Sequence, residues 1–443
     1  MARLFGTDGV RGIANRELSP ELALGLGRAG ASVLARHGDS PILVGRDTRI
    51  SGDMLEAALV AGITSAGVDA VLVGVIPTPA VAYLTKSMKA AAGVVISASH
   101  NPVVDNGIKF FAEGGLKLSE SLEDEIAARI GSTSELPIGE GVGRAHTDDE
   151  AWKGYAAFLV SLSSSLQGLR IVIDAAHGAA WHIAPYVLSH LGAEVIPIHV
   201  EPNGTNINVE CGSTHPATLQ RAVLAHRADA GLAFDGDADR LIAVDERGQI
   251  VDGDHLLVIF GLDMLRQGEL KKKTVAATLY SNLGLHRALE RHGGHVLTAN
   301  AGDRYVLEAM LDAGLNLGGE QSGHIIFLDH ATTGDGVLSA LQLLGVMQRT
   351  GQKLSMLAAQ MERVPQRLVN AHVCSKGWEN NEAIRQAIAE AERQLAGQGR
   401  LLVRTSGTEP LVRVMAEGLD AVRVEELAEG VAAVIERELG AKV

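Results

Sequence analysis

The sequence predicts an α/β protein built from several sheets, and two observations carry this prediction. Short apolar runs rich in β-branched residues, such as 42–45 and 171–174, alternate with longer stretches of helical periodicity, such as 54–65. This alternation is typical of α/β layers around a largely parallel sheet. The chain is also 443 residues long, which corresponds to two to four domains at roughly 100–200 residues each.

The same rhythm continues along most of the chain. Further strands are expected at 70–75, 93–96, 107–111, 194–198, 229–234, 274–278, 295–298 and 325–328, with helices between them that include 177–191 and 216–227. The last stretch differs, because a short turn separates two of its strands and predicts an antiparallel α+β module. Its strands are expected at 368–373, 401–404 and 411–416, and its amphipathic helices at 381–395 and 421–439.

Three breaks divide the chain into four expected domains. A polar, Gly-rich stretch runs from 131 to 149, a second break falls near 248–253, and Pro365 follows a helix. We therefore expect three α/β domains with mixed sheets and one smaller α+β domain. Their expected limits are 1–148 for domain I, 149–250 for domain II, 251–365 for domain III and 366–443 for domain IV.

The composition excludes several classes of protein. The chain has 39 Lys and Arg against 53 Asp and Glu, a net charge of −14, and only 3% aromatic residues. Both values argue against a nucleic-acid-binding protein. Two cysteines, Cys211 and Cys374, are too few for a disulfide framework or a zinc knuckle and fit a reducing compartment. With no apolar run of membrane-spanning length and no signal peptide, a cytoplasmic location is expected.

Four polar loops follow strands, and many of the 51 glycines lie in loops of this kind. Open α/β sheets bind their ligands at this edge. The first loop, 97–102, reads SASHNP, and Pro102 makes it a rigid turn that displays Ser99. Such a serine is a nucleophile if a base, a metal or a phosphoryl group assists it, and an ordinary capped turn is the alternative. Lys109, in the next strand, either snorkels to solvent, faces a phosphate or acts as an acid or base.

The second loop, 235–240, reads DGDADR. Its three alternating carboxylates would share one face of an extended segment and would repel one another unless a divalent cation joined them. An EF-hand is excluded, because Arg240 stands where that motif needs glycine and the flanks are strands. Arg240 beside a cation indicates a further anion, such as a phosphate. We therefore expect a metal site here rather than a solvated acidic turn.

The third and fourth loops suit a polyhydroxylated and a phosphorylated ligand. Loop 318–324, GGEQSGH, offers several hydrogen-bonding groups, although a polar β-turn has a similar composition. Loop 404–410, RTSGTEP, with Arg413 beyond it, is typical of a phosphate cradle, and a capping cluster is the alternative. Two more Gly-rich loops, 5–12 and 45–49, match neither a P-loop nor a Rossmann fingerprint, so nucleotide binding has no support.

Together the loops resemble the α-D-phosphohexomutase superfamily, and within it the phosphoglucosamine mutases. FGTDGVRG, SASHNP, DGDADR, GEQSGH and RTSGTEP occur across the whole chain in the family's order and spacing. The first, fourth and fifth of these are more similar to phosphoglucosamine mutase than to phosphomannomutase/phosphoglucomutase. The resemblance implies four domains arranged around one central cleft, with one loop from each domain.

The resemblance also implies an activity, which is the interconversion of glucosamine 6-phosphate and glucosamine 1-phosphate. This isomerase step leads to UDP-N-acetylglucosamine for peptidoglycan synthesis. The implied cofactors are one Mg²⁺, a phosphate on Ser99, and glucosamine 1,6-bisphosphate as intermediate or activator. The implied partners are small-molecule sugar phosphates, with no nucleic acid and no membrane, and a homodimer is one option for the assembly.

Individual residues receive roles through the same resemblance. Ser99 would be the phosphoserine, and a phosphoryl oxygen on it would join Asp235, Asp237 and Asp239 around Mg²⁺. The implied catalytic residues are Ser99, His100, Lys109 and Arg240, with Lys109 as the candidate for moving the hydroxyl proton. The implied substrate-binding residues are Arg11, Glu320, Ser322, His324, Arg404, Ser406, Gly407, Thr408 and Arg413.

Three other functions are considered beside this one. A phosphomannomutase or phosphoglucomutase of the same superfamily would use the same machinery on another sugar. A Mg²⁺-dependent sugar-phosphate phosphatase could use the same Ser and Asp residues, but it would release inorganic phosphate stoichiometrically. A sugar-phosphate-binding regulator would need no serine beside a metal site, which this chain has, and is therefore the least favoured.

Overall fold

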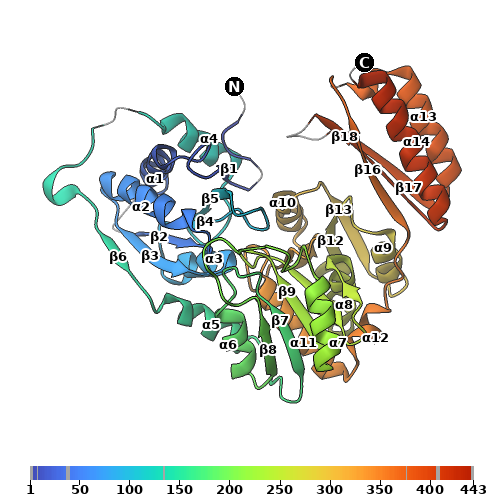
Figure 1. The fold of residues 1–443 in the computed structure, drawn as a ribbon, viewed down its shortest axis with the longest axis horizontal. Coiled ribbons are helices and arrows are strands. Elements are labelled where there is room, and N and C mark those ends of the chain that lie inside the picture. Colours follow the sequence, from blue (N-terminus) through green and yellow to red (C-terminus); the bar gives the residue numbers. More distant parts are fainter. Residues whose placement is uncertain are drawn as a thin grey trace. The chain divides into compact units, whose positions relative to one another are not determined.

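The computed structural model describes residues 3–6, 8–35, 40–132, 135–375, 377–405 and 410–440. The chain divides into two compact units (Figure 1), of which one comprises 1–280 and 292–360 and the other 281–291 and 361–443. The larger unit holds three sheets and the smaller unit holds one. No described helix is long and apolar enough to cross a membrane.

The first sheet of the larger unit has six strands in the order β1-β5-β4-β2-β3-β6. Its strands are β1 (Val10–Ile13), β2 (Ile42–Arg46), β3 (Ala70–Val75), β4 (Ala92–Ile96), β5 (Asp105–Ala112) and β6 (Ala145–Thr147). Strands β2, β3, β4 and β6 run parallel, and β5 is antiparallel to both β4 and β1. The helices are α1 (Pro20–Leu34), α2 (Ser51–Ser65), α3 (Thr78–Ser87) and α4 (Glu120–Arg129). Helices α1, α2 and α4 share one apolar core with the sheet.

The second sheet has five strands in the order β11-β10-β9-β7-β8. Its strands are β7 (Arg170–Asp174), β8 (Glu194–Ile198), β9 (Ala230–Phe234), β10 (Leu241–Asp245) and β11 (Ile250–Val251), and its helices are α5 (Ala151–Ser161), α6 (Ile183–His190) and α7 (Ala217–His226). Strands β7, β8 and β9 are parallel, and β10 turns back antiparallel to β9. The turn between β9 and β10 carries the three aspartates of the DGDADR loop.

The third sheet has four strands in the order β13-β12-β14-β15. Its strands are β12 (Thr274–Thr278), β13 (His295–Ala299), β14 (Leu317–Gly319) and β15 (Ile325–Phe327), and its helices are α8 (Gly253–Gln267), α10 (Asp303–Ala313), α11 (Gly336–Thr350) and α12 (Leu354–Ala358). Strands β14 and β15 form a tight antiparallel pair. The GEQSGH loop is the turn of this pair.

The smaller unit is an antiparallel module. Its sheet has the order β16-β18-β17, with β16 (Gln366–His372), β17 (Gly399–Thr405) and β18 (Leu411–Gly418). Its helices are α9 (Leu283–Glu290), α13 (Glu382–Leu395) and α14 (Ala421–Leu439), and the last two share an apolar core with the sheet. Short 3₁₀ turns lie at Gly139–Gly141, Lys271–Lys273 and Trp378–Asn380. The predicted α/β class, with mixed sheets and a smaller antiparallel C-terminal module, is confirmed.

Local sequence signals set the ends of several helices. The Ser19 side chain accepts a hydrogen bond from the Leu22 N–H at the start of α1, and Pro20 occupies the first helical turn. Asp252 caps α8 in the same way, and Gly268 ends that helix with a left-handed backbone. Several expected elements differ in length by a few residues, and the largest difference is in the helix expected over 177–191, which begins only at Ile183. The reason is that Ala176 and His177 also adopt left-handed backbone angles, which a helix cannot accommodate.

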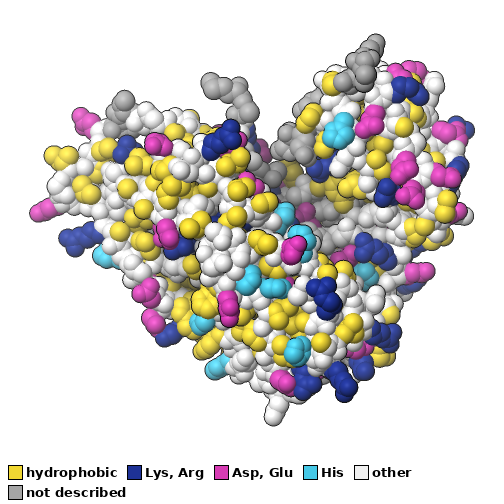
Figure 2. All heavy atoms as spheres, in the orientation of Figure 1, with side chains coloured by type: hydrophobic (Ala, Val, Ile, Leu, Met, Phe, Trp, Pro, Cys, Tyr) yellow, Lys and Arg dark blue, Asp and Glu magenta, His cyan; other side chains and the backbone are white. Residues whose placement is uncertain are grey.

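The surface agrees with the charge pattern of the sequence. Acidic and basic side chains are interspersed over the face of the molecule in Figure 2, and hydrophobic side chains lie between them.

Helices α1 and α2 cross so closely that a glycine of each helix, Gly27 of α1 and Gly62 of α2, packs against the backbone of the other. A Cβ placed on Gly62 of α2 would lie 2.2 Å from the carbonyl oxygen of Leu24 and 2.8 Å from the amide nitrogen of Arg28, both in α1. Because these are backbone atoms, the whole helix would have to move. We predict that Gly62→Ala lowers the stability of the protein by about 1–3 kcal/mol, measured by calorimetry or urea unfolding.

A matched control is available in the same unit. Gly154 of α5 is exposed, and a Cβ there would meet only the Leu84 side chain at an ordinary 3.7 Å. Gly154→Ala should therefore stabilise the helix by about 0.5–1 kcal/mol. Equal effects of the two substitutions would contradict the packing argument.

Candidate active site

The loop after β4, residues 97–102 (the Ser99 loop), presents its serine from a well-ordered turn. Ser99 is 1% exposed and has a left-handed backbone with φ of 52°, which is uncommon for any residue other than glycine. The Ser97 hydroxyl accepts a hydrogen bond from the Ser99 N–H at 2.9 Å and donates to Asp47 at 2.6 Å. The position of Ser99 is thus fixed by its neighbours and not by a regular element.

Three aspartates of the turn after β9 lie directly beside this serine. Asp235, Asp237 and Asp239 are at most 4% exposed, and one oxygen of each lies within 4.8 Å of the others. The Ser99 hydroxyl donates to Asp235 Oδ2 at 2.6 Å. The structure therefore brings together two loops that lie more than 130 residues apart in the sequence.

The electrostatics of these aspartates favour a bound cation. Burial, and then the charges of Asp239 and Asp237, raise the pKa of Asp235 well above its usual range. The Oδ1 atoms of Asp237 and Asp239 are buried and form no hydrogen bond with any described residue. Carboxylate oxygens are the ligands that hard divalent cations prefer. The three residues therefore fit such an ion, which would supply the missing partner of these oxygens.

Three cationic groups, Lys109, Arg240 and Arg11, lie near the same cluster, and Lys117 joins them through Asp8. Lys109 of β5 is 4% exposed, and its Nζ lies 2.9 Å from Asp237 Oδ2 and 2.8 Å from Asp8 Oδ2, so it does not snorkel to solvent. Burial opposes its charge, but the charges of Asp237 and Asp8 prevail and raise the pKa of Lys109. Arg240 Nε lies 3.7 Å from Asp239 Oδ1, and Arg11 pairs with Asp8, as does Lys117.

His100 also lies close to the serine hydroxyl. Its Nδ1 atom is 3.3 Å from Ser99 Oγ. Burial, and then the charges of Arg240 and Arg11, lower the pKa of His100 to about 4. The imidazole is therefore neutral at pH 7 and can accept a proton.

The GEQSGH turn of the third sheet reaches the same cluster. His324 is 2% exposed, with Nδ1 3.4 Å from Asp239 Oδ2, and its Nε2 accepts the Gly334 N–H at 3.0 Å. Burial opposes its charge, but Asp239 outweighs this effect and raises the pKa of His324. Gly323 has a φ of +90°, and a Cβ there would lie 2.0 Å from the Leu241 carbonyl oxygen, so only glycine lets this turn contact β10.

Two other residues of this turn offer groups for a ligand. Glu320 accepts a hydrogen bond from the Gly302 N–H at 3.1 Å, and burial raises its pKa. The Ser322 hydroxyl is buried and bonds to no described residue. A carboxylate and an unsatisfied hydroxyl at one turn suit a ligand with several hydroxyl groups.

The predicted phosphate cradle belongs to the smaller unit. Arg404 of β17 and Arg413 of β18 are register partners in adjacent antiparallel strands, so their side chains project from the same face of that sheet. Like charges opposite each other are unfavourable unless an anion lies between them. The other expected cradle residues, Ser406, Gly407 and Thr408, lie outside the described residues.

Comparison with known proteins identifies the family. The chain matches the phosphoglucomutase/phosphomannomutase models for α/β/α domain I over residues 2–136, domain II over 153–248, domain III over 252–364 and the C-terminal domain over 368–434. The chain belongs to the phosphoglucomutase/phosphomannomutase family. The resemblance found in its sequence motifs is confirmed, and membership makes the chain a phosphohexomutase, an isomerase of hexose phosphates.

Curated relatives narrow the comparison within this family. The chain is 56% identical to phosphoglucosamine mutase from Desulforamulus reducens, over 98% of this chain and 99% of the relative. It is 57% identical to phosphoglucosamine mutase from Desulforudis audaxviator, over 98% of each chain.

Solved structures of the family share the fold. A phosphoglucomutase/phosphomannomutase family protein from Burkholderia thailandensis superposes with a TM-score of 0.84 at 26% identity, covering 99% of this chain and 98% of that one. N-acetylphosphoglucosamine mutase from Aspergillus fumigatus, solved with GlcNAc-6P and magnesium, superposes with a TM-score of 0.71 at 18% identity, covering 99% and 96%.

The phosphohexomutase site contains residues that the sequence motifs did not single out. Asp8 pairs with Lys109, Arg11 and Lys117, and Lys117 also pairs with Asp303 at the start of α10. Burial would raise the pKa of Asp8, but Lys109, Lys117 and Arg11 hold it well below its usual range. Asp8 lies within the FGTDGVRG motif and could have been found there, whereas Lys117 and Asp303 carry no motif signal.

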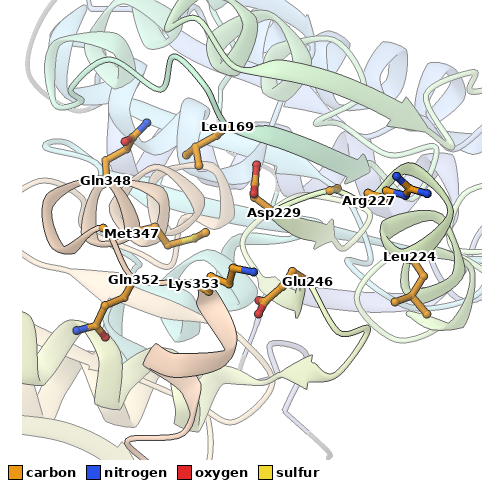
Figure 3. A pocket seen from close by; sticks show the side chains of 11 residues that line it. Leu169, Leu224, Arg227, Asp229, Glu246, Met347, Gln348, Gln352 and Lys353 are labelled. Atoms are coloured by element: carbon orange, nitrogen blue, oxygen red, sulfur yellow. The ribbon is translucent and has the colours of Figure 1, made fainter.

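A surface hollow and a second cluster of polar side chains lie apart from the site residues described above. A hollow of about 430 Å³ lies between the end of α7, the β10–β11 turn and the end of α11, and Asp229, Glu246 and Lys353 are among the residues that line it (Figure 3). Asp174, His199 and Cys211 form a second cluster of potential metal ligands. Asp174 already accepts the backbone N–H groups of Ala176 and Gly212, so it anchors the loops at the end of β7.

The ion network gives a stability prediction. Lys109→Met would leave the buried carboxylate of Asp237 without the lysine that pairs with it, so the free energy of unfolding should fall by about 3–5 kcal/mol. Urea unfolding in a metal-free buffer measures this loss. Lys153→Met removes an exposed lysine of α5 that pairs with exposed Glu150 and lies over the Trp152 ring, and it should cost about 0.5 kcal/mol or less. Similar losses for both variants would contradict the network.

Proposed function

We propose that this chain is a phosphoglucosamine mutase, which interconverts glucosamine 6-phosphate and glucosamine 1-phosphate on the route to UDP-N-acetylglucosamine. The observation that carries the proposal is Ser99 Oγ at 2.6 Å from Asp235, inside a cluster of three buried carboxylates. The identity of 56–57% with curated phosphoglucosamine mutases over nearly the full chain supports the choice of sugar.

In this proposal Ser99 carries the phosphoryl group that is exchanged with the sugar. The bond from Ser99 Oγ to phosphorus breaks, a bond from a sugar oxygen to phosphorus forms, and the sugar hydroxyl gives up its proton. The product is glucosamine 1,6-bisphosphate. After the bisphosphate turns over, its other phosphoryl group returns to Ser99. Phosphoryl transfer of this kind depends mainly on positioning and on neutralisation of charge.

The charged groups around Ser99 supply that neutralisation. Asp235, Asp237 and Asp239 would hold one Mg²⁺, and when bound it would anchor the phosphoryl group and draw charge from it. Lys109 and Arg240 would face the phosphoryl oxygens, with Arg11 nearby. Because Asp237 and Asp8 keep Lys109 protonated, it can donate a proton to an oxygen more readily than accept one.

Neutral His100 is the second candidate for moving the hydroxyl proton. Its Nδ1 lies beside Ser99 Oγ, and its low pKa leaves this nitrogen unprotonated at pH 7, although the same low pKa makes the imidazole a weak base. Lys109, which is protonated, and His100, which is neutral, would thus act as a proton donor and a proton acceptor.

The remaining residues would bind the parts of the substrate that do not react. Glu320 and Ser322 would hold sugar hydroxyls, with His324 beside them. The second phosphate would be held by Arg404, Ser406, Gly407, Thr408 and Arg413. Because the sugar turns over between the two transfers, this cradle must accept the 1-phosphate and the 6-phosphate alike.

Other features of the protein are proposals of the same kind. We propose domain limits of 1–148, 149–250, 251–365 and 366–443, which are supported by one sheet in each range, except that β11 of the second sheet ends one residue beyond 250. A cytoplasmic location is supported by two cysteines that form no disulfide. The homodimer stays a prediction, to be tested by light scattering after size exclusion.

Two alternatives are separated by kinetics. A phosphomannomutase or phosphoglucomutase would show a higher kcat/KM for mannose or glucose phosphates than for glucosamine phosphates. A phosphatase would release one inorganic phosphate for each substrate consumed, whereas a mutase keeps water away during transfer and releases little. A coupled assay with the three sugar phosphates and a phosphate assay on the same samples distinguish these outcomes.

The first prediction from this function concerns Ser99 itself. Intact-mass and peptide mass spectrometry of the purified protein should find a phosphate on Ser99. Ser99→Ala should abolish turnover of glucosamine 6-phosphate, even with the bisphosphate added, because no group remains to receive the phosphoryl. Ser87→Ala, at an exposed serine of α3, should keep full activity. Substantial turnover by Ser99→Ala would refute the phosphoserine mechanism.

The second prediction concerns the metal. Asn can replace Asp235 with the same shape, bonding the Arg240 N–H and the Ser99 hydroxyl, while it removes one of three repelling charges. Asp235→Asn should therefore match or exceed the wild-type melting temperature in EDTA. Mg²⁺ should raise the melting temperature of the wild type but not of the variant, since a ligand stabilises only the state that binds it.

The control for the metal is an aspartate away from the cluster. Asp312→Asn, exposed on α10, should respond to Mg²⁺ as the wild type does. An equal shift of Asp235→Asn and wild type on addition of Mg²⁺ would mean that the metal binds elsewhere.

A further inference from the structure

The carbonyl group of Ser99 is held by donors from two different sheets. Arg49 Nη2, from the loop after β2, donates to this oxygen at 2.9 Å, and Asn208 Nδ2, from the loop that precedes α7, donates to it at 2.8 Å. The Ser99 N–H is held as well, by the Ser97 hydroxyl. Both peptide groups of a residue in a left-handed conformation are therefore fixed by side chains.

The Arg49 side chain forms most of its hydrogen bonds with the Ser99 loop. Its side chain is fully buried, and each of its five N–H donors has an acceptor. Nε bonds to the Asp47 carboxylate, and the other four bonds end on backbone carbonyl oxygens of Ser99, Asn101, Pro102 and Asp105. A guanidinium that binds three carbonyls of the Ser99 loop and the carbonyl at the start of β5 determines the path of that loop.

Asn208 connects the same carbonyl to the second sheet. Its amide also reaches the Asn101 oxygen at 3.3 Å, and its own N–H donates to the Ala176 carbonyl at 3.0 Å. The buried carboxylate of Asp174, at the end of β7, accepts a hydrogen bond from the Ala176 N–H and so anchors this turn. Asn208 therefore links Ser99 to the end of β7 through a chain of hydrogen bonds.

The acidic turn is in contact with this same point. A Cβ on Gly236 would lie 2.5 Å from the Ser99 carbonyl oxygen and 2.9 Å from Asn208 Nδ2. The backbone between Asp235 and Asp237 thus packs directly on the Ser99–Asn208 hydrogen bond. The oxygen is the point at which the Ser99 loop and the acidic turn are aligned with each other.

We propose that Arg49 and Asn208 are positioning residues for phosphoryl transfer, which fix Ser99 Oγ against the carboxylate cluster by holding the Ser99 carbonyl from two sheets. The inference rests on the proposed phosphoserine function. Neither side chain contacts the Ser99 hydroxyl, so each acts through the backbone of Ser99. Without the donors, Ser99 can relax toward a negative φ, which turns its side chain away from Asp235.

This role affects catalysis and binding differently. The groups expected to hold the sugar and the second phosphate lie on other loops, so KM should change little. A misplacement of about 1 Å at a reacting group can cost about a hundredfold in rate. A phosphoryl group that is poorly aligned with the sugar hydroxyl should also be lost to water more often in each turnover.

The decisive variant is Asn208→Ala. It should lower kcat by about tenfold or more, leave KM within about twofold, and raise the amount of inorganic phosphate released per turnover. Asn208→Asp, which keeps the side-chain shape but removes the N–H donors, should act in the same direction. Arg49→Lys, which keeps the charge opposite Asp47 but offers only three donors, should also lower kcat.

The matched control is Asn206→Ala in the same loop. The Asn206 amide also donates to a backbone carbonyl, but that carbonyl belongs to Glu201 and not to the Ser99 loop. This variant should keep the wild-type kcat and the wild-type level of phosphate release. Melting temperatures of all variants separate a loss of folded protein from a loss of alignment.

The outcomes separate this inference from the function on which it rests. A wild-type protein without phosphate on Ser99 and without mutase turnover would overturn both. An active, phosphorylated wild type with Asn208→Ala and Asn208→Asp within about twofold of its kcat would leave the function standing and overturn the positioning role. A loss shared equally by Asn206→Ala would overturn it as well.

Discussion

Three buried carboxylates, each with an oxygen within 4.8 Å of the others, are the constraint on which the arrangement of the larger unit depends. Such a group is unstable alone, because burial and mutual repulsion both oppose ionisation. Lysine and arginine side chains from the first sheet and the acidic turn, together with His324 from the third sheet, offset this negative charge. The three sheets of this unit therefore meet at one electrostatic cluster.

The same ion pairs also hold the sheets of this unit in position relative to one another. Asp8 and Lys109 join the N-terminal loop to β5, Lys117 and Asp303 join the first sheet to α10, and Lys109 and Asp237 join the first sheet to the second. Removing Lys109 would leave the buried carboxylate of Asp237 without the lysine that pairs with it, and the loss of one partner of a buried ion pair is strongly destabilising. The arrangement needed for chemistry is thus also required for stability.

The sequence alone predicted the strand-and-helix order, the antiparallel C-terminal module and the loops that carry Ser99 and the aspartates. These features depend on local periodicity, turn residues and short motifs. The start of α6 was missed because the left-handed residues Ala176 and His177 are not glycines and carry no local signal. Arg49 and Asn208 were not recognised as important, because their role lies in contacts with Ser99 across 50 and 109 residues of chain.

The balance of charges explains why the proposed phosphoryl group and the proposed cation belong together. Within the described residues, the carboxylates of Asp8, Asp235, Asp237, Asp239 and Asp303 face the cations of Arg11, Lys109, Lys117 and Arg240. A phosphoserine adds about two negative charges, and a divalent cation adds two positive ones. Either group alone would shift a nearly balanced, buried cluster by two charges, whereas both together leave the balance as it stands. The same balance is kept when the phosphoryl group passes from Ser99 to a sugar oxygen beside it, because the transferred charge stays among the same cations.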